Sequence, residues 1–192
     1  MCIRDSYIWS ESWYLDHAVQ IFQQQYGPLE EFHVLALLPA YLERPGSSLV
    51  SMAQYFIEKS GSAHSGFYLY NQDELLAKLD QLKQDHRKVL LLGVTFALLD
   101  LAESGKDFSA KENLIVMETG GMKGRRKEMI REEVHDILKG YFGIDAIHSE
   151  YGMTELMSQA YSKGDGKYTL PDSMRVRLRD VNDPFSLSLI HI

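Results

Sequence analysis

Short apolar runs that alternate with segments of helical periodicity constrain the fold of this chain more than any other feature. The runs consist of nearly continuous Val, Ile and Leu, which is typical of strands that are covered on both faces. Helical segments between such strands provide the long crossovers that parallel pairing requires. We therefore predict parallel strands at 34–38, 67–70, 89–94, 114–117 and 144–147.

The segments between the runs carry apolar stripes at the spacing of one helix face. They predict helices at 48–59, around 75–82 and at 125–141. We expect Asn71 and Glu74 to form a capping box at the start of the second helix, and Gly140 or Gly143 to end the third. The predicted fold class is α/β, with a doubly wound, mostly parallel sheet and helices on both faces.

Apolar and basic side chains alternate near the end of the chain, at 174–179. A period of two is typical of a strand with one apolar face and one basic face. We expect this strand to add to the edge of the sheet or to begin a neighbouring sheet.

Length and composition exclude several classes of protein. At 192 residues and 45% hydrophobic content, the chain suits one domain or a large part of one. The net charge of −7 argues against nucleic acid or an anionic membrane as a partner. No apolar run approaches the roughly 20 residues that span a bilayer, and no secretory signal is visible, so we expect a cytoplasmic protein. The only cysteine is Cys2, which leaves no disulfide framework or thiolate metal cluster.

Both ends of the sequence resemble translated sequencing-adapter DNA. On this interpretation, 1–6 and 187–192 are non-native, and 7–186 is an internal fragment of a longer protein. The alternative is that both ends are ordinary termini.

Polar, aromatic and glycine residues follow four of the predicted strands. They are 39–43 after the first strand, Thr95 and Phe96 after the third, 118–121 after the fourth and 149–155 after the fifth. In open α/β sheets, ligands bind at the carboxyl ends of the strands. We therefore expect these residues to lie along one edge of the sheet and to form a binding site.

The last of these segments contains the side chains that a nucleotide and its magnesium ion require. Tyr151 can stack on adenine, Thr154 can hydrogen-bond a phosphate oxygen, and Glu155 can bind Mg²⁺. Gly120 and Gly121 let a ligand approach the backbone because neither has a Cβ. From residue type alone, the alternatives are a helix capped by Thr154 and a tight turn at the two glycines.

The run Tyr151-Gly152-Met153-Thr154-Glu155 closely resembles the Tyr-Gly-x-Thr-Glu motif of the adenylate-forming superfamily, which includes acyl-CoA ligases and firefly luciferase. Further segments resemble the acyl-protein synthetase family of LuxE type, whose members are similar to phenylacetate-CoA ligases. These segments cover most of 20–186 and are 35–39, 43–44, 46–50, 66–70, 93–100, 117–126 and 148–161.

This resemblance implies that 7–186 is part of the large N-terminal, AMP-binding domain of such an enzyme. It assigns stacking on adenine to Tyr151 and contact with the α-phosphate to Thr154, while Glu155 is the implied metal ligand and, with Thr154, a catalytic residue. The implied nucleotide-binding residues are Gly120, Gly121, Tyr151, Gly152, Met153 and Thr154. The implied acyl-pocket residues are Thr95, Phe96 and Gly121.

The implied reaction uses ATP and Mg²⁺ to activate a carboxylic acid, fatty or aryl, as an acyl-adenylate. The acyl group then passes to a thiol acceptor, either a protein cysteine or a CoA-like thiol. The Ser/Thr/Gly-rich phosphate loop of the family, its ribose-binding Asp, its C-terminal Lys and its acyl-accepting Cys have no match in this sequence. We therefore expect the chain itself to be unable to complete the reaction.

Two other function classes stay open at this point. A non-catalytic nucleotide- or acyl-binding module would also lack the phosphate loop, and pyrophosphate exchange by the longer parent would argue against it. A sugar-nucleotide transferase on a similar sheet would need a metal-binding Asp-x-Asp after a strand, which the sequence does not contain.

Overall fold

The structure is a computed structural model, and it describes residues 8–39, 46–106, 108–109, 112–122, 127–177 and 183. Both segments expected to be non-native lie outside the described residues. The described strands are β1 (Phe32–Leu37), β2 (Gly66–Tyr68), β3 (Lys88–Val94), β4 (Leu114–Thr119), β5 (His148–Met153), β6 (Ser158–Ser162) and β7 (Tyr168–Thr169). The helices are α1 (Glu11–Tyr26), α2 (Ser48–Ser60), α3 (Gln72–Leu82), α4 (Thr95–Ala102) and α5 (Arg131–Phe142), with 3-10 turns η1 (Leu29–Glu31) and η2 (Thr154–Leu156).

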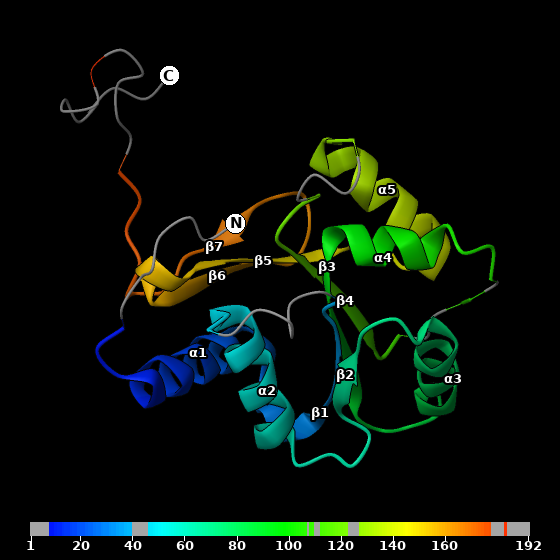
Figure 1. The fold of residues 1–192 in the computed structure, drawn as a ribbon, viewed down its shortest axis with the longest axis horizontal. Helices are drawn as coiled ribbons and strands as arrows, with labels where there is room; N and C mark the ends of the chain where they lie inside the picture. Colours follow the sequence, from blue (N-terminus) through cyan, green and yellow to red (C-terminus); the bar gives the residue numbers. More distant parts are fainter. Residues whose placement is uncertain are drawn as a thin grey trace.

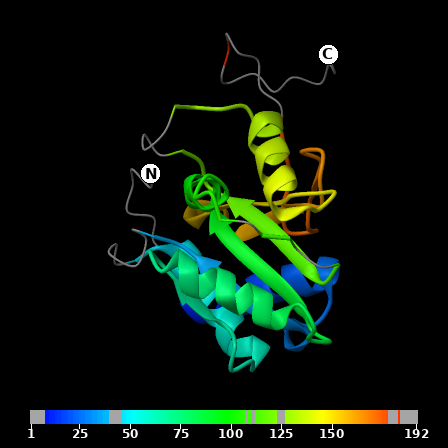
Figure 2. The same cartoon turned by 90° about the vertical axis from the view of Figure 1, so that its right-hand side faces the viewer.

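The strands form one sheet in the order β2-β1-β3-β4-β5-β6-β7 (Figure 1). The five strands from β2 to β5 in this order are parallel, and the arrows of β3 and β4 point the same way in Figure 2. β6 and β7 extend the sheet with antiparallel pairing. The predicted α/β fold class with a mostly parallel sheet is confirmed.

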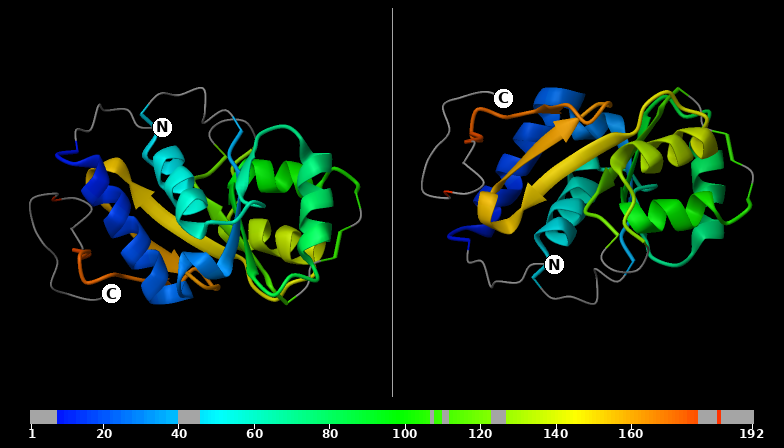
Figure 3. Two further views of the ribbon diagram at one scale, coloured as in Figure 1. Left: turned by 90° about the horizontal axis from the view of Figure 1, so that it is seen from below. Right: turned by 90° about the horizontal axis from the view of Figure 1, so that it is seen from above.

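The helices form two layers, one on each side of the sheet. α1 packs against α2 and β6, while α4 packs against α5, β3 and β4. Figure 3 shows α1 and α2 on one side and α3, α4 and α5 on the other. The chain therefore winds in both directions from β1, and the strand order reverses between β1 and β3. Among the described residues, no helix has both the length and the apolar character needed to cross a membrane.

The apolar runs predict four strands correctly and misplace the fifth. β1 to β4 overlap the predicted runs, but the prediction of a strand at 144–147 is wrong because β5 begins at His148. β5 is polar, and its residues Ser149 and Glu150 are nevertheless buried. Residues of β4 and β6 pair with them and cover them. The hydrophobic pattern therefore ends at Ile147, just before the strand begins.

The helix capped by Thr154, which residue type left open as an alternative, does not form. The three-residue turn η2 leads instead into β6, which returns antiparallel beside β5. Met157 ends the turn in the left-handed conformation, with φ of 50°, and this reverses the chain direction. β7 is the edge strand at this end of the sheet. Residues 174–177 of the strand predicted at 174–179 form no strand, and 178–179 lie outside the described residues.

The ends of two predicted helices differ from expectation. Asn71 makes no side-chain hydrogen bond to the first turn of α3, so the capping box is wrong; its amide instead donates to the Glu74 carboxylate. The helix predicted at 125–141 corresponds to the shorter α5. Gly143 ends α5 in the left-handed conformation, with φ of 66°, which confirms one of the two expected terminators.

α1 and α4 are the two described helices that the sequence patterning does not predict, and α1 is the longer of them. The Ser10 side chain caps its start by accepting a hydrogen bond from Trp13 N at 3.2 Å, and Gly27, with φ of 97°, ends it. Phe22 on this helix is fully buried at the centre of an aromatic cluster. Its ring centroid lies 4.8, 5.5, 5.1 and 5.9 Å from those of Tyr26, Phe32, Phe56 and Tyr161, respectively. The cluster joins α1 to β1, α2 and β6.

We predict that Phe22→Ala lowers the free energy of unfolding by about 3–5 kcal/mol, because it leaves a cavity where four elements meet. Gln24→Ala, which truncates an exposed side chain of the same helix, should change the free energy by only about 0.5 kcal/mol. Urea melts of both variants measure the difference. Equal, small effects of the two substitutions would show that α1 does not belong to the core.

Candidate functional site

The carboxyl ends of β3, β4 and β5 meet at one edge of the sheet. Val94 pairs with Thr119, and Thr119 pairs with Glu150. Thr95, Gly120 and Tyr151 are the next residues of the three segments, so the structure places them side by side, as the parallel crossovers predict. Of the segment 39–43, which was expected on the same edge after β1, residues 40–43 lie outside the described residues.

Beyond its last pair with β4, β5 continues alone beside β6. Tyr151, Gly152 and Met153 pair only with β6, and all three are exposed. The Tyr151 side chain is 46% exposed, and its ring meets Tyr168 of β7 edge-on with centroids 6.1 Å apart. An aromatic ring that is held on one side and open on the other can stack on a planar ligand.

Thr154 lies against the start of α2. Its Oγ1 is 2.9 Å from Ser48 Oγ, while the Ser47 side chain caps the helix by accepting from Val50 N at 3.4 Å. Backbone N–H groups and the helix dipole favour negative charge at the start of a helix. The Thr154 hydroxyl is therefore positioned where a phosphate group would be stabilised.

Glu155 is exposed one residue further along η2. Within the described ranges, no three His, Cys, Asp or Glu side chains gather as a metal cluster. Mg²⁺ nevertheless binds commonly through one or two carboxylates together with water and substrate phosphates. Glu155 beside a phosphate-binding Thr154 fits that pattern of coordination.

The glycine pair offers open backbone at the same edge. Gly120 adopts a φ of 77°, a conformation that favours glycine, and follows directly from β4. A Cβ at Gly121 would meet no atom within 4 Å. The backbone at these two positions is therefore accessible to a ligand that reaches Tyr151 from the end of β4.

Thr95 and Phe96 begin α4 and are both buried. Thr95 Oγ1 donates to Glu118 Oε2 at 2.7 Å and contacts the Thr119 carbonyl at 3.3 Å. The structure thus directs the hydroxyl of Thr95 toward β4. The assignment of both residues to an acyl pocket stays a prediction.

Glu118 is a buried carboxylate beneath the site, and it does not belong to the Tyr-Gly-x-Thr-Glu motif. Its Oε1 lies 3.7 Å from His135 Nε2 and 3.8 Å from Arg131 Nε, both on α5. Burial acts to raise the pKa of Glu118, but His135, Thr95, Ser149 and Arg131 together hold it below its ordinary value of 4.5. The sequence places Glu118 in the strand-end segment 118–121 but assigns it no role.

Glu150 is the second buried carboxyl group, and it lies on the opposite face of the sheet. Its Oε2 accepts a hydrogen bond from the Thr119 hydroxyl. Burial raises the pKa of Glu150 to about 7, and the nearby charge of Glu118 adds to this effect, while the hydrogen bond from Thr119 opposes it. Glu150 is therefore buried, whereas Glu155, the other acidic residue of this region, is exposed.

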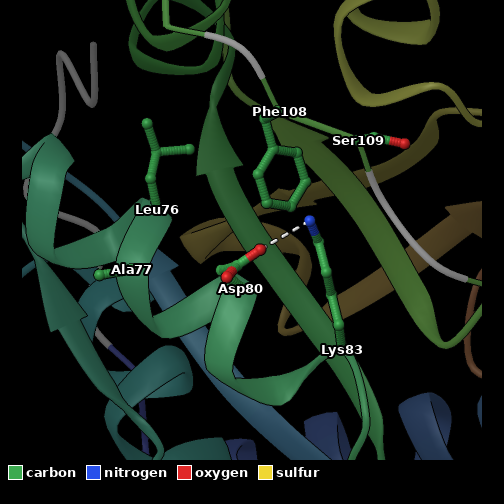
Figure 4. A pocket seen from close by; sticks show the side chains of 6 residues that line it. All are labelled: Leu76, Ala77, Asp80, Lys83, Phe108 and Ser109. Atoms are coloured by element: carbon green, nitrogen blue, oxygen red, sulfur yellow. Dashed lines mark ion pairs between the residues drawn. The ribbon is translucent and has the colours of Figure 1, made fainter.

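A surface pocket of about 410 Å³ lies away from this edge (Figure 4). Figure 4 shows the ion pair between Asp80 and Lys83, whose charged atoms are 2.8 Å apart, beside the ring of Phe108. The remaining lining residues are Leu76, Ala77 and Ser109. All six residues come from α3, from the turn after it or from the connection that precedes β4. None of the residues that line the pocket belongs to the strand ends where the glycine pair and Tyr151 meet.

No protein-family profile matches the chain, and no curated protein matches it. Among solved structures, the fold is similar to the ATP-bound RpMatB-BxBclM chimera B1, with a TM-score of 0.55 and 17% identity. That match covers 81% of this chain and 28% of the chimera. Coronafacic acid ligase from Pectobacterium brasiliense matches with a TM-score of 0.49 and 18% identity, over 79% of this chain and 28% of the ligase. The chain thus spans little more than a quarter of either protein, and the likeness to the chimera shows the fold.

We predict that Glu118→Gln flattens the pH dependence of stability in acid. The pKa of Glu118 in the folded protein lies below 4.5, so its contribution to stability is complete above pH 4.5 and is lost as the pH falls further. Urea melts over this range should show a smaller acid-induced loss for Glu118→Gln than for the unchanged chain. The exposed Glu132, in the first turn of α5, provides the control Glu132→Gln, which should retain the full loss. Parallel pH profiles for all three proteins would contradict the prediction.

Proposed function

We propose that the chain is part of an ATP-dependent ligase that forms acyl-adenylates, of the LuxE acyl-protein synthetase type. The observation that carries this proposal is the convergence of Gly120, Tyr151 and Thr154 at the carboxyl edge of the sheet, next to the start of α2. Open backbone, an exposed ring and a hydroxyl at a helix N-terminus suit adenine at one end and phosphate at the other. The fold shared with an ATP-bound protein supports the same conclusion.

In the proposed reaction, a carboxylate of the substrate attacks the α-phosphorus of ATP. The bond to the β-phosphate breaks, pyrophosphate leaves, and an acyl-adenylate forms. A thiol, from a protein cysteine or a CoA-like molecule, then displaces AMP. Mg²⁺ would supply charge stabilisation where negative charge builds on the phosphates.

The proposed roles follow the positions of the side chains. Tyr151 stacks on adenine, Gly152 and Met153 line the nucleotide and acyl channel, Thr154 contacts the α-phosphate, and Glu155 binds Mg²⁺. The glycine pair borders adenine, and the acyl pocket would be bordered by Thr95, Phe96 and Gly121. A fatty or aryl acid and a cytoplasmic location complete the proposal.

A non-catalytic nucleotide- or acyl-binding module is the alternative that uses the same edge of the sheet. It predicts nucleotide binding without chemistry. Pyrophosphate exchange driven by fatty or aryl acids, measured on the longer parent, separates the two functions.

We predict that AMP binds at the sheet edge and leaves the pocket of Figure 4 unaffected. Titration of the ¹⁵N-labelled chain with AMP should shift the amide signals of Gly120, Gly121 and 151–155. NMR suits this test because it detects even weak binding by a partial site. Shifts confined to Leu76, Ala77 and Phe108, or no shifts at all, would contradict the proposed site.

We predict that Glu155→Gln weakens Mg²⁺-dependent ATP binding about tenfold or more, because it removes the proposed charged ligand of the ion. Its cost in the free energy of unfolding should be only about 0.3–1 kcal/mol, since Glu155 is exposed in a short turn. Calorimetric titration with ATP and Mg²⁺, alongside urea melts, measures both quantities. Glu30→Gln is the control, because Glu30 is an exposed carboxylate that precedes β1 at the other end of the strands. Equal ATP affinity in the two variants would remove Glu155 from the metal site.

A further inference from the structure

Glu150 is a buried carboxyl group to which the proposed reaction gives no role. It is 8% exposed, and its described hydrogen-bond partner is the Thr119 hydroxyl on β4. No Lys, Arg or His side chain forms an ion pair with it among the residues that the structure describes. The titratable groups that interact electrostatically with it are Tyr14 of α1 and Tyr161 of β6 on its own face of the sheet, and Glu118 of β4 and Tyr168 of β7 on the opposite face.

The Glu150 carboxyl group also lies against the backbone of Gly152. A Cβ at position 152 would be 2.3 Å from Glu150 Oε1 and 3.3 Å from Gln159 Cγ. Gly152 pairs with Gln159 and Glu150 pairs with Tyr161, so these four residues share the face of the hairpin that packs on α1. Glu150 thus connects β4, through Thr119, to the backbone between Tyr151 and Thr154.

The surroundings of Glu150 favour its neutral form. Gln159 Oε1 and the Tyr161 hydroxyl are buried on the same face and have no hydrogen-bond partner within the described part of the chain. A neutral carboxylic acid has an O–H donor for such a neighbour, whereas a carboxylate has none. An ionised carboxylate buried without a cation is costly, and burial accordingly raises the pKa of Glu150 to about 7.

We propose that Glu150 is a positioning residue of the nucleotide site, whose neutral carboxyl group packs against the backbone of Gly152 so that the segments 120–121 and 151–154 keep their binding geometry. When the carboxyl group loses its proton to solvent, a buried carboxylate remains beside the negative Glu118. The hairpin backbone at Gly152 then shifts to admit water to this charge. The role of Glu150 in nucleotide binding rests on the proposed function, but the proton-dependent arrangement of 151–154 does not.

The direction of the pH effect follows from the raised pKa. The folded protein binds this proton more tightly than the unfolded chain, where the ordinary value is 4.5. The contribution of Glu150 to stability is therefore complete below pH 4.5 and is lost as the pH rises to about 7. Nucleotide affinity should fall in the same direction, because only the protonated form holds the binding geometry.

The test is NMR on the chain without nucleotide, from about pH 5.5 to about pH 8.5. The ¹³C signal of the Glu150 carboxyl carbon should titrate with a midpoint near pH 7, and the amide signals of Thr119, Tyr151 and Gly152 should follow the same curve. Glu150→Gln should abolish the amide transition while preserving the fold. The control Asp165→Asn removes an exposed carboxylate from the turn after β6, at a residue with φ of 55° that Asn tolerates, and should retain the transition.

AMP titrations supply the second readout. The dissociation constant of the unchanged chain should rise by up to about 30-fold between about pH 6 and about pH 8.5, because the protonated fraction falls by that factor. The dissociation constant of Glu150→Gln should stay constant over this range. A purely structural role for Glu150 would lower stability without producing this difference in pH profile.

A carboxyl midpoint below about pH 5.5, or an amide transition that survives in Glu150→Gln, would overturn the inference. If Glu150→Gln fails to fold, the carboxyl titration of the unchanged chain decides the question alone. If the apo transition occurs as expected but AMP causes no shifts at any pH, the proposed nucleotide function fails and the control of 151–154 by Glu150 stands.

Discussion

The parallel pairing of β4 with β5 is the constraint on which the candidate site depends. The register from Met117–His148 to Thr119–Glu150 brings Gly120 and Tyr151 to the same level at the end of the sheet. Because side chains alternate between the faces of a strand, a slip of one residue would exchange the surroundings of every β5 side chain. It would also separate Tyr151 from the glycine pair. The register therefore fixes both the packing of the sheet and the geometry of its functional edge.

The same pairing buries two carboxyl groups on adjacent rungs and opposite faces, and the protein stabilises them in different ways. Glu118 faces α5, where Arg131 compensates its negative charge and the His135 ring lies beside it. Glu150 faces α1, where the nearby titratable groups are tyrosines, so its neutral form is favoured and its pKa rises to about 7. The cost of burying an acid is thus offset by a cation, Arg131, on one face and by a bound proton on the other. Both arrangements lie directly beneath the residues proposed to bind the nucleotide.

The sequence predicts the elements whose burial follows from their own composition. β1 to β4 are found because both of their faces are covered by apolar side chains, and the crossover rule then places Thr95, Gly120 and Tyr151 at one edge. β5 is missed because Ser149 and Glu150 are buried by partners that are distant in the sequence. α1 is missed because its role depends on an aromatic cluster drawn from three other elements. The hairpin after Tyr151 depends on the left-handed conformation of a single residue, Met157, for which glycine would be the usual signal.

The position of adenine in a complex tests the functional interpretation most directly. A crystal structure of the chain with a non-hydrolysable acyl-sulfamoyl adenosine would locate the adenine ring and the sulfamoyl group that replaces the α-phosphate. We expect adenine to lie between the ring of Tyr151 and the backbone of Gly120 and Gly121, with the sulfamoyl group beside Thr154 at the start of α2. Adenine bound instead in the pocket between α3 and Phe108, or turned so that Thr154 contacts the base, would contradict the assignment of the sheet edge as an acyl-adenylate site.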